Sequence, residues 1–279
     1  MSTQDAVTPA SARIILICSG KGGVGKTTLT ANLGIALARL GERTVVIDAD
    51  FGLRNLDLLL GLENRIVYTA QEVLAGSCRL EQALVKHKLE PNLSLMPAGN
   101  PRMLEWLTPD DMKTVANLVA ERADYVLIDC PAGVEQGFKN AAAACREAIV
   151  ITTPEMSAVR DADRVIGLLN SQGIQPVQLV LNRVRPKMVA NQEMLAVDDV
   201  TDILALPLLG LVVEDEQVIV STNRGEPLTL NGTSSPAARA YMNVARRLRG
   251  EGVPLIDPSK ERRGLRARLM AKLRKSGNS

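Results

Sequence analysis

The chain has 279 residues, of which 46% are hydrophobic and 2% aromatic, which suits one large α/β domain, or two small ones, with an aliphatic core. The net charge is only +2, although eight basic residues and one acidic residue lie between positions 260 and 275. The rest of the chain is therefore net negative, which argues against nucleic-acid binding by the main body.

The two ends of the chain and its cysteines indicate where the protein works. Residues 1–12 are polar and lack the basic and apolar regions of a signal peptide. No apolar run reaches the roughly 18 residues that a membrane-spanning helix needs, so we expect a cytoplasmic protein. Its cysteines, Cys18, Cys78, Cys130 and Cys145, form no C-x-x-C pair. We therefore expect reduced, buried thiols rather than disulfides or a zinc site.

Short apolar segments, many of them β-branched, recur between helical patterns and predict strands. They are RIILIC (13–18), RTVVID (43–48), YVLID (125–129), AIVIT (148–152), VQLVLN (177–182) and LLGLVV (208–213). Strands that alternate with helices predict a doubly wound, mostly parallel sheet covered on both faces. One helix is expected over 26–40, ending near Gly41, and another over 108–123, with Thr108 as N-cap and Pro109 at its first position.

A glycine-rich loop joins the first strand to the first helix. Residues 19–28 read SGKGGVGKTT, which fits G-x-x-x-x-G-K-[ST] in the strand-loop-helix context that this motif requires. Lys26 would reach the β- and γ-phosphates, and the Thr27 hydroxyl would bind Mg²⁺. The alternative is an ordinary glycine-rich turn. We expect a nucleotide site formed by Gly22, Gly23, Val24, Gly25, Lys26, Thr27 and Thr28, and this motif leaves Lys21 unexplained.

Acidic residues follow two of the predicted strands. Asp129 ends a buried strand, where a carboxylate is expected to face the ligand crevice and order the hydration shell of Mg²⁺. Asp48 and Asp50 follow the second strand; Asp48 could serve the metal, and Asp50 could hold the attacking water. The alternatives are a cap residue at position 129 and solvated turn residues at 48 and 50.

The loop KGGVGKTT, with its extra lysine, resembles the deviant Walker A signature of the ParA/MinD class of ATPases. Within that class, DADFGLRNLD (48–57), TPEMSAVRDADR (153–164) and the basic C-terminus resemble the MinD group, which places the bacterial division site. The resemblance runs from about residue 13 to 275. It implies slow, partner-stimulated hydrolysis of ATP, with Mg²⁺, by a homodimer in which Lys21 reaches the partner's phosphates, so that Lys21 and Asp50 are the expected catalytic residues.

The resemblance also implies further contacts. Asn182 and Arg183 would touch the adenine, although Val213 stands where the family usually has a proline, which leaves the fit of the base pocket open. The start of the helix near 157 would bind partner proteins, a MinC-like division inhibitor and a MinE-like ATPase activator. The residues implied there are Ser157, Arg160, Asp161 and Asp163, and the alternative is a helix terminus without a partner role.

The C-terminal segment KERRGLRARLMAKLRK (260–275) combines basic residues with an apolar face. Leu265, Leu269 and Leu273 recur at every fourth residue and Met270 adjoins them, the profile of a helix that lies in a membrane interface on anionic lipids. Arg266 falls inside the apolar arc. The alternative is a solvated or nucleic-acid-binding tail, but the segment has no aromatic side chain to stack on bases.

These patterns divide the chain into a polar extension (1–12), a P-loop ATPase domain (13–251), a linker (252–259) and a membrane-targeting tail (260–279). We expect the protein to lie in the cytoplasm and on the inner face of the cell membrane, with no specific nucleic-acid partner. The alternatives are a ParA-type DNA-partition ATPase, a flagellar-number relative of the MinD group, and an iron–sulfur scaffold or reductase of the same superfamily. The last of these needs paired or interface-placed cysteines, and Cys130 has no second cysteine near it in the sequence.

Overall fold

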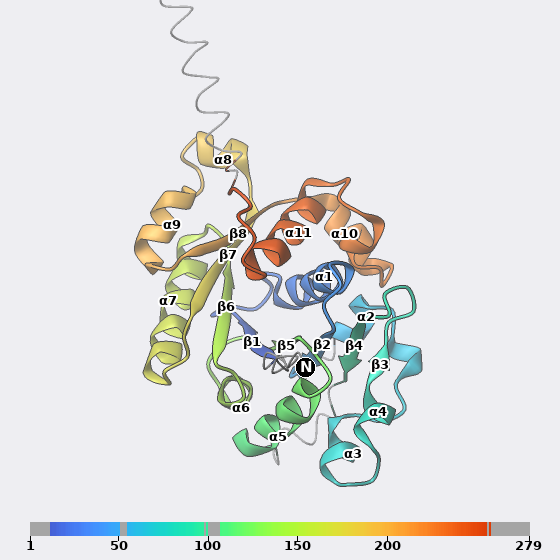
Figure 1. Cartoon of the computed structure of the whole chain (residues 1–279). Helices are drawn as coiled ribbons and strands as arrows, with labels where there is room; N and C mark the ends of the chain where they lie inside the picture. Colours follow the sequence, from blue (N-terminus) through green and yellow to red (C-terminus); the bar gives the residue numbers. More distant parts are fainter. Residues whose placement is uncertain (1–11, 51–54, 98, 100–106, 256, 258–279) are drawn as a thin grey trace, which may run out of the picture.

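The computed structural model describes residues 12–50, 55–97, 99, 107–255 and 257. They form an eight-stranded sheet of order β3-β4-β2-β5-β1-β6-β7-β8 (Figure 1). The strands are β1 (Arg13–Cys18), β2 (Thr44–Asp48), β3 (Val85–Lys86), β4 (Leu93–Met96), β5 (Tyr125–Asp129), β6 (Glu147–Thr152), β7 (Val177–Val184) and β8 (Leu208–Val213). Neighbouring strands are parallel except β3, which pairs with β4 in the antiparallel sense. The predicted doubly wound, mostly parallel sheet is confirmed.

Helices cover both faces of this sheet. They are α1 (Lys26–Arg39), α2 (Leu56–Leu59), α3 (Ala70–Leu74), α4 (Leu80–Ala83), α5 (Pro109–Ala120), α6 (Gln136–Ala143), α7 (Met156–Ser171), α8 (Pro186–Ala190), α9 (Val197–Leu204), α10 (Glu216–Asn223) and α11 (Pro236–Leu248), with short 3₁₀ turns at Glu63–Arg65 and Leu228–Asn231. None of the helices in the described ranges is long and apolar enough to cross a membrane.

Two apolar cores lie on opposite faces of the sheet because side chains alternate along each strand. In β1, Ile15 and Ile17 pack in the core that includes α1 and α11, whereas Leu16 and Cys18 pack in the core with α5, α6 and α7. Both sets are buried. This two-sided burial explains why the central strands read as continuous apolar runs in the sequence.

The helix signals in the sequence correspond to observed termini. The Thr108 hydroxyl accepts a hydrogen bond from the backbone N–H of Asp111, whose carboxylate accepts one from the Thr108 N–H, and Pro109 is the first residue of α5. Helix α1 ends at Arg39, and Gly41 follows with φ of 92°, a left-handed conformation that favours glycine. The expected starts and stops of these two helices are therefore confirmed to within a few residues.

Two strands and one cysteine differ from expectation. Strands β3 and β4 were not predicted, because two and four residues are too few to show a clear strand pattern, and β4 is set by pairing with β2. Cys18, Cys130 and Cys145 are buried free thiols. The expectation of burial is wrong for Cys78, which lies partly exposed in the turn between α3 and α4.

The topology predicts a ligand site at the carboxyl end of β1. The chain passes from β1 through α1 to β2 on one side, and β6 joins β1 on its other side, so the strand order reverses at β1. In open α/β sheets, ligands bind at the carboxyl edge at such a reversal. The glycine-rich loop lies there, between the last residue of β1 and the first residue of α1.

Candidate nucleotide-binding site

The glycine-rich loop has a backbone that depends on its glycines. Gly25 is the N-cap of α1 with φ of 103°, and a Cβ atom at this position would lie 2.5 Å from Nδ2 of Asn182. No side chain caps the N-terminus of α1 in the described structure. A glycine-rich loop that opens directly into a helix in this way is typical of phosphate sites, because its N–H groups and the helix dipole favour an anion.

The side chain of Asn182 contacts the backbone of the loop. Its Nδ2 donates a 2.8 Å hydrogen bond to the carbonyl of Val24, and the side chain is buried. Arg183 follows with φ of 54°, which is uncommon for a residue other than glycine. Next to them lies a cavity of about 180 Å³, lined by both residues together with Gly25, Thr28, Val213, Glu214, Asp215, Val218, Ile219 and Tyr241. The two residues that are expected to contact the adenine thus line a cavity next to the glycine-rich loop.

Lys26 and Asp129 lie together at the carboxyl edge of the sheet. Lys26 is only 8% exposed, and its charge acts on the carboxylate of Asp129, which is fully buried. The hydroxyl of Thr30 donates to Oδ1 of Asp129 over 3.1 Å, and Thr27 also donates to this carboxylate. Burial raises the pKa of Asp129 to about 6, against the hydrogen bonds from both threonines and the charge of Lys26. The structure thus brings Lys26, Thr27 and Asp129 together.

Asp48 lies beside Asp129, because the two residues are register partners at the ends of β2 and β5. Burial and the neighbouring Asp129 carboxylate raise the pKa of Asp48 well above its usual range. Its Oδ1 accepts a 2.9 Å hydrogen bond from the backbone N–H of Asp50, and its Oδ2 accepts one from the N–H of Leu56. Asp48 therefore anchors both ends of the segment that carries Asp50, which is itself half-buried.

These residues suit a magnesium ion better than a softer metal. Hydroxyl and carboxylate oxygens are the ligands that Mg²⁺ prefers, and it usually keeps several waters, so that one or two protein ligands suffice. No group of three or more His, Cys, Asp or Glu residues able to hold a metal ion occurs within the described residues. The donor set at Thr27 and Asp129, with Asp48 adjacent, fits a metal bound mainly through phosphate and water.

Lys21 lies apart from Lys26. It is exposed, and its Nζ donates a 3.4 Å hydrogen bond to Oγ of Ser157 at the start of α7 in the same chain. The loop also packs directly on that helix, since a Cβ atom at Gly20 would lie 2.1 Å from the carbonyl oxygen of Asp161. The loop and the first turns of α7 are thus one packed unit.

The expected partner residues lie on this same helix. Ser157, Arg160 and Asp163 are exposed, and Asp161 is half-exposed with its carboxylate 3.7 Å from Arg164. Helix α7 has Glu155 as its N-cap, without a side-chain hydrogen bond at the cap. The expected membrane residues Leu265, Leu269, Met270 and Leu273 lie outside the described residues.

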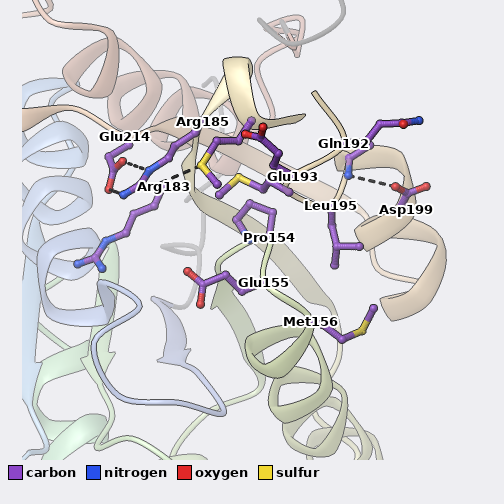
Figure 2. A pocket seen from close by; sticks show the side chains of 13 residues that line it. Pro154, Glu155, Met156, Arg183, Arg185, Gln192, Glu193, Leu195, Asp199 and Glu214 are labelled. Atoms are coloured by element: carbon purple, nitrogen blue, oxygen red, sulfur yellow. Dashed lines mark hydrogen bonds and ion pairs between the residues drawn. The ribbon is translucent and has the colours of Figure 1, made fainter. Parts of the chain in front are cut away.

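A larger hollow of about 630 Å³ (Figure 2) shares Arg183 and Glu214 with the 180 Å³ cavity. The smaller space is called the base cavity, because the residues expected to contact the adenine line it. The larger hollow is bordered by the start of α7, the end of β7, α8 and the segment that leads into α9. Arg185 and Glu214, which both line this hollow, point toward one another (Figure 2). Their bidentate ion pair joins the residues that follow β7 and β8.

Sequence reasoning missed several of these residues. Thr30 follows Thr27 at a spacing that places both hydroxyls on one side of α1, and this signal was present in the sequence. Arg185 and Glu214 are separated by 29 positions, and no local pattern pairs them. Asp215 caps α10 by accepting from the N–H of Gln217, a role that its position before the helix could have revealed.

Comparison with known proteins agrees with this geometry. Residues 15–228 match the CobQ/CobB/MinD/ParA nucleotide binding domain family. The septum site-determining protein MinD of Synechocystis sp. is 56% identical over 245 residues, which are 88% of this chain and 92% of that protein.

Two solved structures extend the comparison. A chain of the MinC:MinD cell division protein complex of Aquifex aeolicus is 45% identical, with a TM-score of 0.83 over 88% of this chain and 99% of that chain. The septum site-determining protein MinD of Pyrococcus horikoshii, complexed with Mg-ADP, is 31% identical, with a TM-score of 0.75 over 85% of this chain and 96% of that chain. The chain therefore belongs to the ParA/MinD family of nucleotide-binding proteins, and within it to the septum site-determining MinD group.

Proposed function

We propose that this chain is an ATPase that dimerises with ATP, binds the inner face of the cell membrane in that form, and regulates where the cell divides. Hydrolysis of ATP to ADP and phosphate, slow by itself and stimulated by a MinE-like activator, returns it to the cytoplasm. A MinC-like inhibitor is its second protein partner.

The observation that carries this proposal is the contrast between the two lysines of one loop. Lys26 is buried against the Asp129 carboxylate, where it would neutralise the phosphates of its own ATP. Lys21 is exposed, and its Nζ donates a 3.4 Å hydrogen bond to the hydroxyl of Ser157. An exposed lysine at this position suits a trans-acting charge on the phosphates of a second subunit.

The remaining site residues have distinct roles in the proposed reaction. Thr27 and Asp129 would hold Mg²⁺, with Asp48 in its outer surroundings; bound there, Mg²⁺ would supply charge neutralisation of the phosphates. Asp50 would hold the attacking water in line with the γ-phosphorus. Its placement is supported by Asp48, whose carboxylate accepts a hydrogen bond from the Asp50 backbone N–H.

Partner binding is proposed for the exposed start of α7. Ser157, Arg160 and Asp163 are open to solvent, with Asp161 beside them. The loop packs on α7 at Gly20 and Asp161. A partner bound to the start of α7 would therefore be separated from the nucleotide only by this helix and the loop. The structural relative from Aquifex aeolicus is a MinC:MinD complex, which supports an inhibitor of that kind as one partner.

Membrane binding is proposed for the C-terminal segment and follows from its sequence. The apolar face of one such helix is short, and even a single myristoyl chain gives only marginal, reversible binding, so a monomer should stay mostly in solution. Two segments presented by a dimer gain avidity on the order of 10²- to 10⁴-fold, because the second meets the bilayer at a high effective concentration. ATP would thus control attachment through dimerisation.

Sedimentation of the full-length protein with ATP, against either anionic liposomes or duplex DNA, tests the proposal. We expect ATP-dependent recovery with liposomes and none with DNA at physiological salt. Recovery with DNA alone would favour the DNA-partition alternative instead.

A further inference from the structure

Two acidic residues line the base cavity, and the first is held by an arginine. Glu214 forms a bidentate ion pair with Arg185, in which Nη2 of Arg185 lies 3.0 Å from Oε1 and Nε donates to Oε2. The hydrogen bond from Arg185 lowers the pKa of Glu214, so this carboxylate is charged at neutral pH. Its oxygens are directed toward Arg185 (Figure 2), and Glu214 lines both the base cavity and the larger hollow.

The second acid, Asp215, is held by backbone groups. Its Oδ1 accepts a 3.0 Å hydrogen bond from the N–H of Gln217 at the start of α10. Its Oδ2 accepts a 3.3 Å hydrogen bond from the N–H of Ala237 at the start of α11. Both carboxylates of the base cavity therefore already have hydrogen-bond donors within the chain.

The engagement of both carboxylates affects which purine base the cavity can bind. Guanine presents two adjacent donors, N1–H and the 2-amino group, which match the two oxygens of one carboxylate. Adenine has an acceptor at N1 and no 2-amino group, so it cannot make this bidentate contact and offers a carboxylate only its 6-amino group. A buried donor without a partner is costly, so guanine is disfavoured wherever the carboxylates of a pocket are already engaged.

We propose that Arg185 is a specificity-determining residue, which disfavours guanine by holding the carboxylate of Glu214 away from the base cavity. The inference rests on the nucleotide site proposed above. Arg185 acts through Glu214, since it lines the larger hollow and not the base cavity. It is therefore a positioning residue.

The backbone around the pair is fixed independently of the arginine. The N–H of Glu214 donates a 3.0 Å hydrogen bond to the carbonyl of Val184, at a register irregularity between β7 and β8. Arg183, at the same irregularity, has φ of 54°, and its side chain points away from Arg185 (Figure 2). Removal of the Arg185 side chain should therefore free the Glu214 carboxylate while the strand pairing stays intact.

Competition binding of ATP and GTP to the full-length protein tests the inference. In Arg185→Ala, and in the longer Arg185→Gln, we expect the ratio of the GTP to the ATP dissociation constant to fall by about 5- to 100-fold, the range for one bidentate contact to a base. Arg185→Ala combined with Glu214→Gln should restore the wild-type ratio. Arg246→Ala is the matched control, because it removes an exposed arginine paired with Glu251 at 2.7 Å, outside the base cavity.

Two results would overturn the inference. One is an unchanged ratio in both Arg185 variants. The other is an equal fall with and without Glu214→Gln, which would mean that the pocket had merely loosened. A wild-type protein that binds neither nucleotide would instead overturn the proposed function itself, so the two failures are distinguishable.

Discussion

The ammonium group of Lys21 lies 3.4 Å from the hydroxyl of Ser157, so the first of the two loop lysines contacts the first turn of α7 within its own chain. The contact is exposed, and exposed polar contacts of lysine are worth little free energy. Lys21 can therefore leave Ser157 at low cost to meet a second subunit. The glycine-rich loop and the proposed partner surface on α7 are in contact through this hydrogen bond.

Substitution of Lys26 and of Lys21 should affect different steps. Lys26→Ala should weaken ATP binding by about 30-fold or more, because a buried charge partner is lost. Lys21→Ala should keep ATP affinity within about fivefold, the value of an exposed contact, but lose dimerisation and turnover. Titration with a fluorescent ATP analogue and sedimentation velocity would measure both. Equal loss of ATP binding in the two variants would remove the distinction.

Asp50 should affect the chemical step and not binding. Asp50→Ala should keep ATP and the ATP-dependent dimer, and it should slow hydrolysis by about 10²-fold, the usual cost of a misplaced reactant. Phosphate release in single-turnover experiments checks this. An unchanged rate would show that Asp50 is only a loop residue.

Gly20 should be intolerant of any side chain. In Gly20→Ala the new Cβ would meet the Asp161 carbonyl oxygen at 2.1 Å and the Ala162 nitrogen at 2.7 Å, and both are backbone atoms that cannot swing away. We expect a loss of about 1 to 3 kcal/mol in the free energy of unfolding, the range for overpacking.

Gly22→Ala is the matched control, because its Cβ would meet only the Ala132 Cβ at 3.9 Å, an ordinary contact. Urea unfolding without nucleotide compares the two variants. Equal stability of both would contradict the close packing of the loop on α7.

His87, the single histidine of the chain, gives a pH dependence. Its Nδ1 accepts hydrogen bonds from the backbone N–H groups of Leu89 and Glu90, at 3.3 and 3.1 Å. Burial lowers its pKa below the ordinary 6.5, and the charges of Arg65 and Lys88 add to the effect. Between the folded-state pKa and 6.5, the unfolded chain therefore binds a proton that the folded chain does not.

The contribution of His87 to the free energy of unfolding should then decrease as the pH falls through 6.5, and His87→Gln should remove that contribution. Asp48 and Asp129, whose pKa values are raised by burial, act in the opposite sense and are unchanged in the variant, so the difference between the two proteins isolates His87. Proton NMR resolves the one imidazole directly and should give a folded-state pKa below 6.5. A value above 6.5 would contradict the buried, neutral state of His87.

The sequence predicted those parts of the structure whose causes are local. Six strands were recognisable because each is buried on one or both faces, and the phosphate loop because its glycines and lysine are contiguous. Asp129 could be predicted because it ends a strand in the crevice.

Contacts between distant residues could not be predicted in this way. Asn182 donates to Val24 from 158 positions away, and only the sheet order brings them together. The pair of Arg185 and Glu214 depends on the irregular end of β7 against β8, which no sequence period encodes. Strand β4 owes its place to β2, since its four residues carry too weak a pattern alone.

The apolar face of the C-terminal segment should be needed for membrane binding but not for dimerisation. Leu269→Glu should abolish liposome binding and leave the ATP-dependent dimer intact, whereas Lys21→Ala should abolish both. Binding should require anionic lipid and weaken with salt, because the basic segment adds an electrostatic term screened over about 8 to 10 Å. A Leu269→Glu variant that still binds liposomes would place the membrane contact elsewhere in the chain.

The central claim is that ATP controls membrane attachment through the dimer. Cosedimentation of the full-length protein with anionic liposomes, in ATP, in ADP and without nucleotide, tests it most directly. We expect strong recovery with ATP and on the order of 10²-fold weaker binding in the other two conditions, the lower end of the avidity gain from paired segments. Equal recovery in all three conditions would contradict the account and make the tail a constitutive anchor.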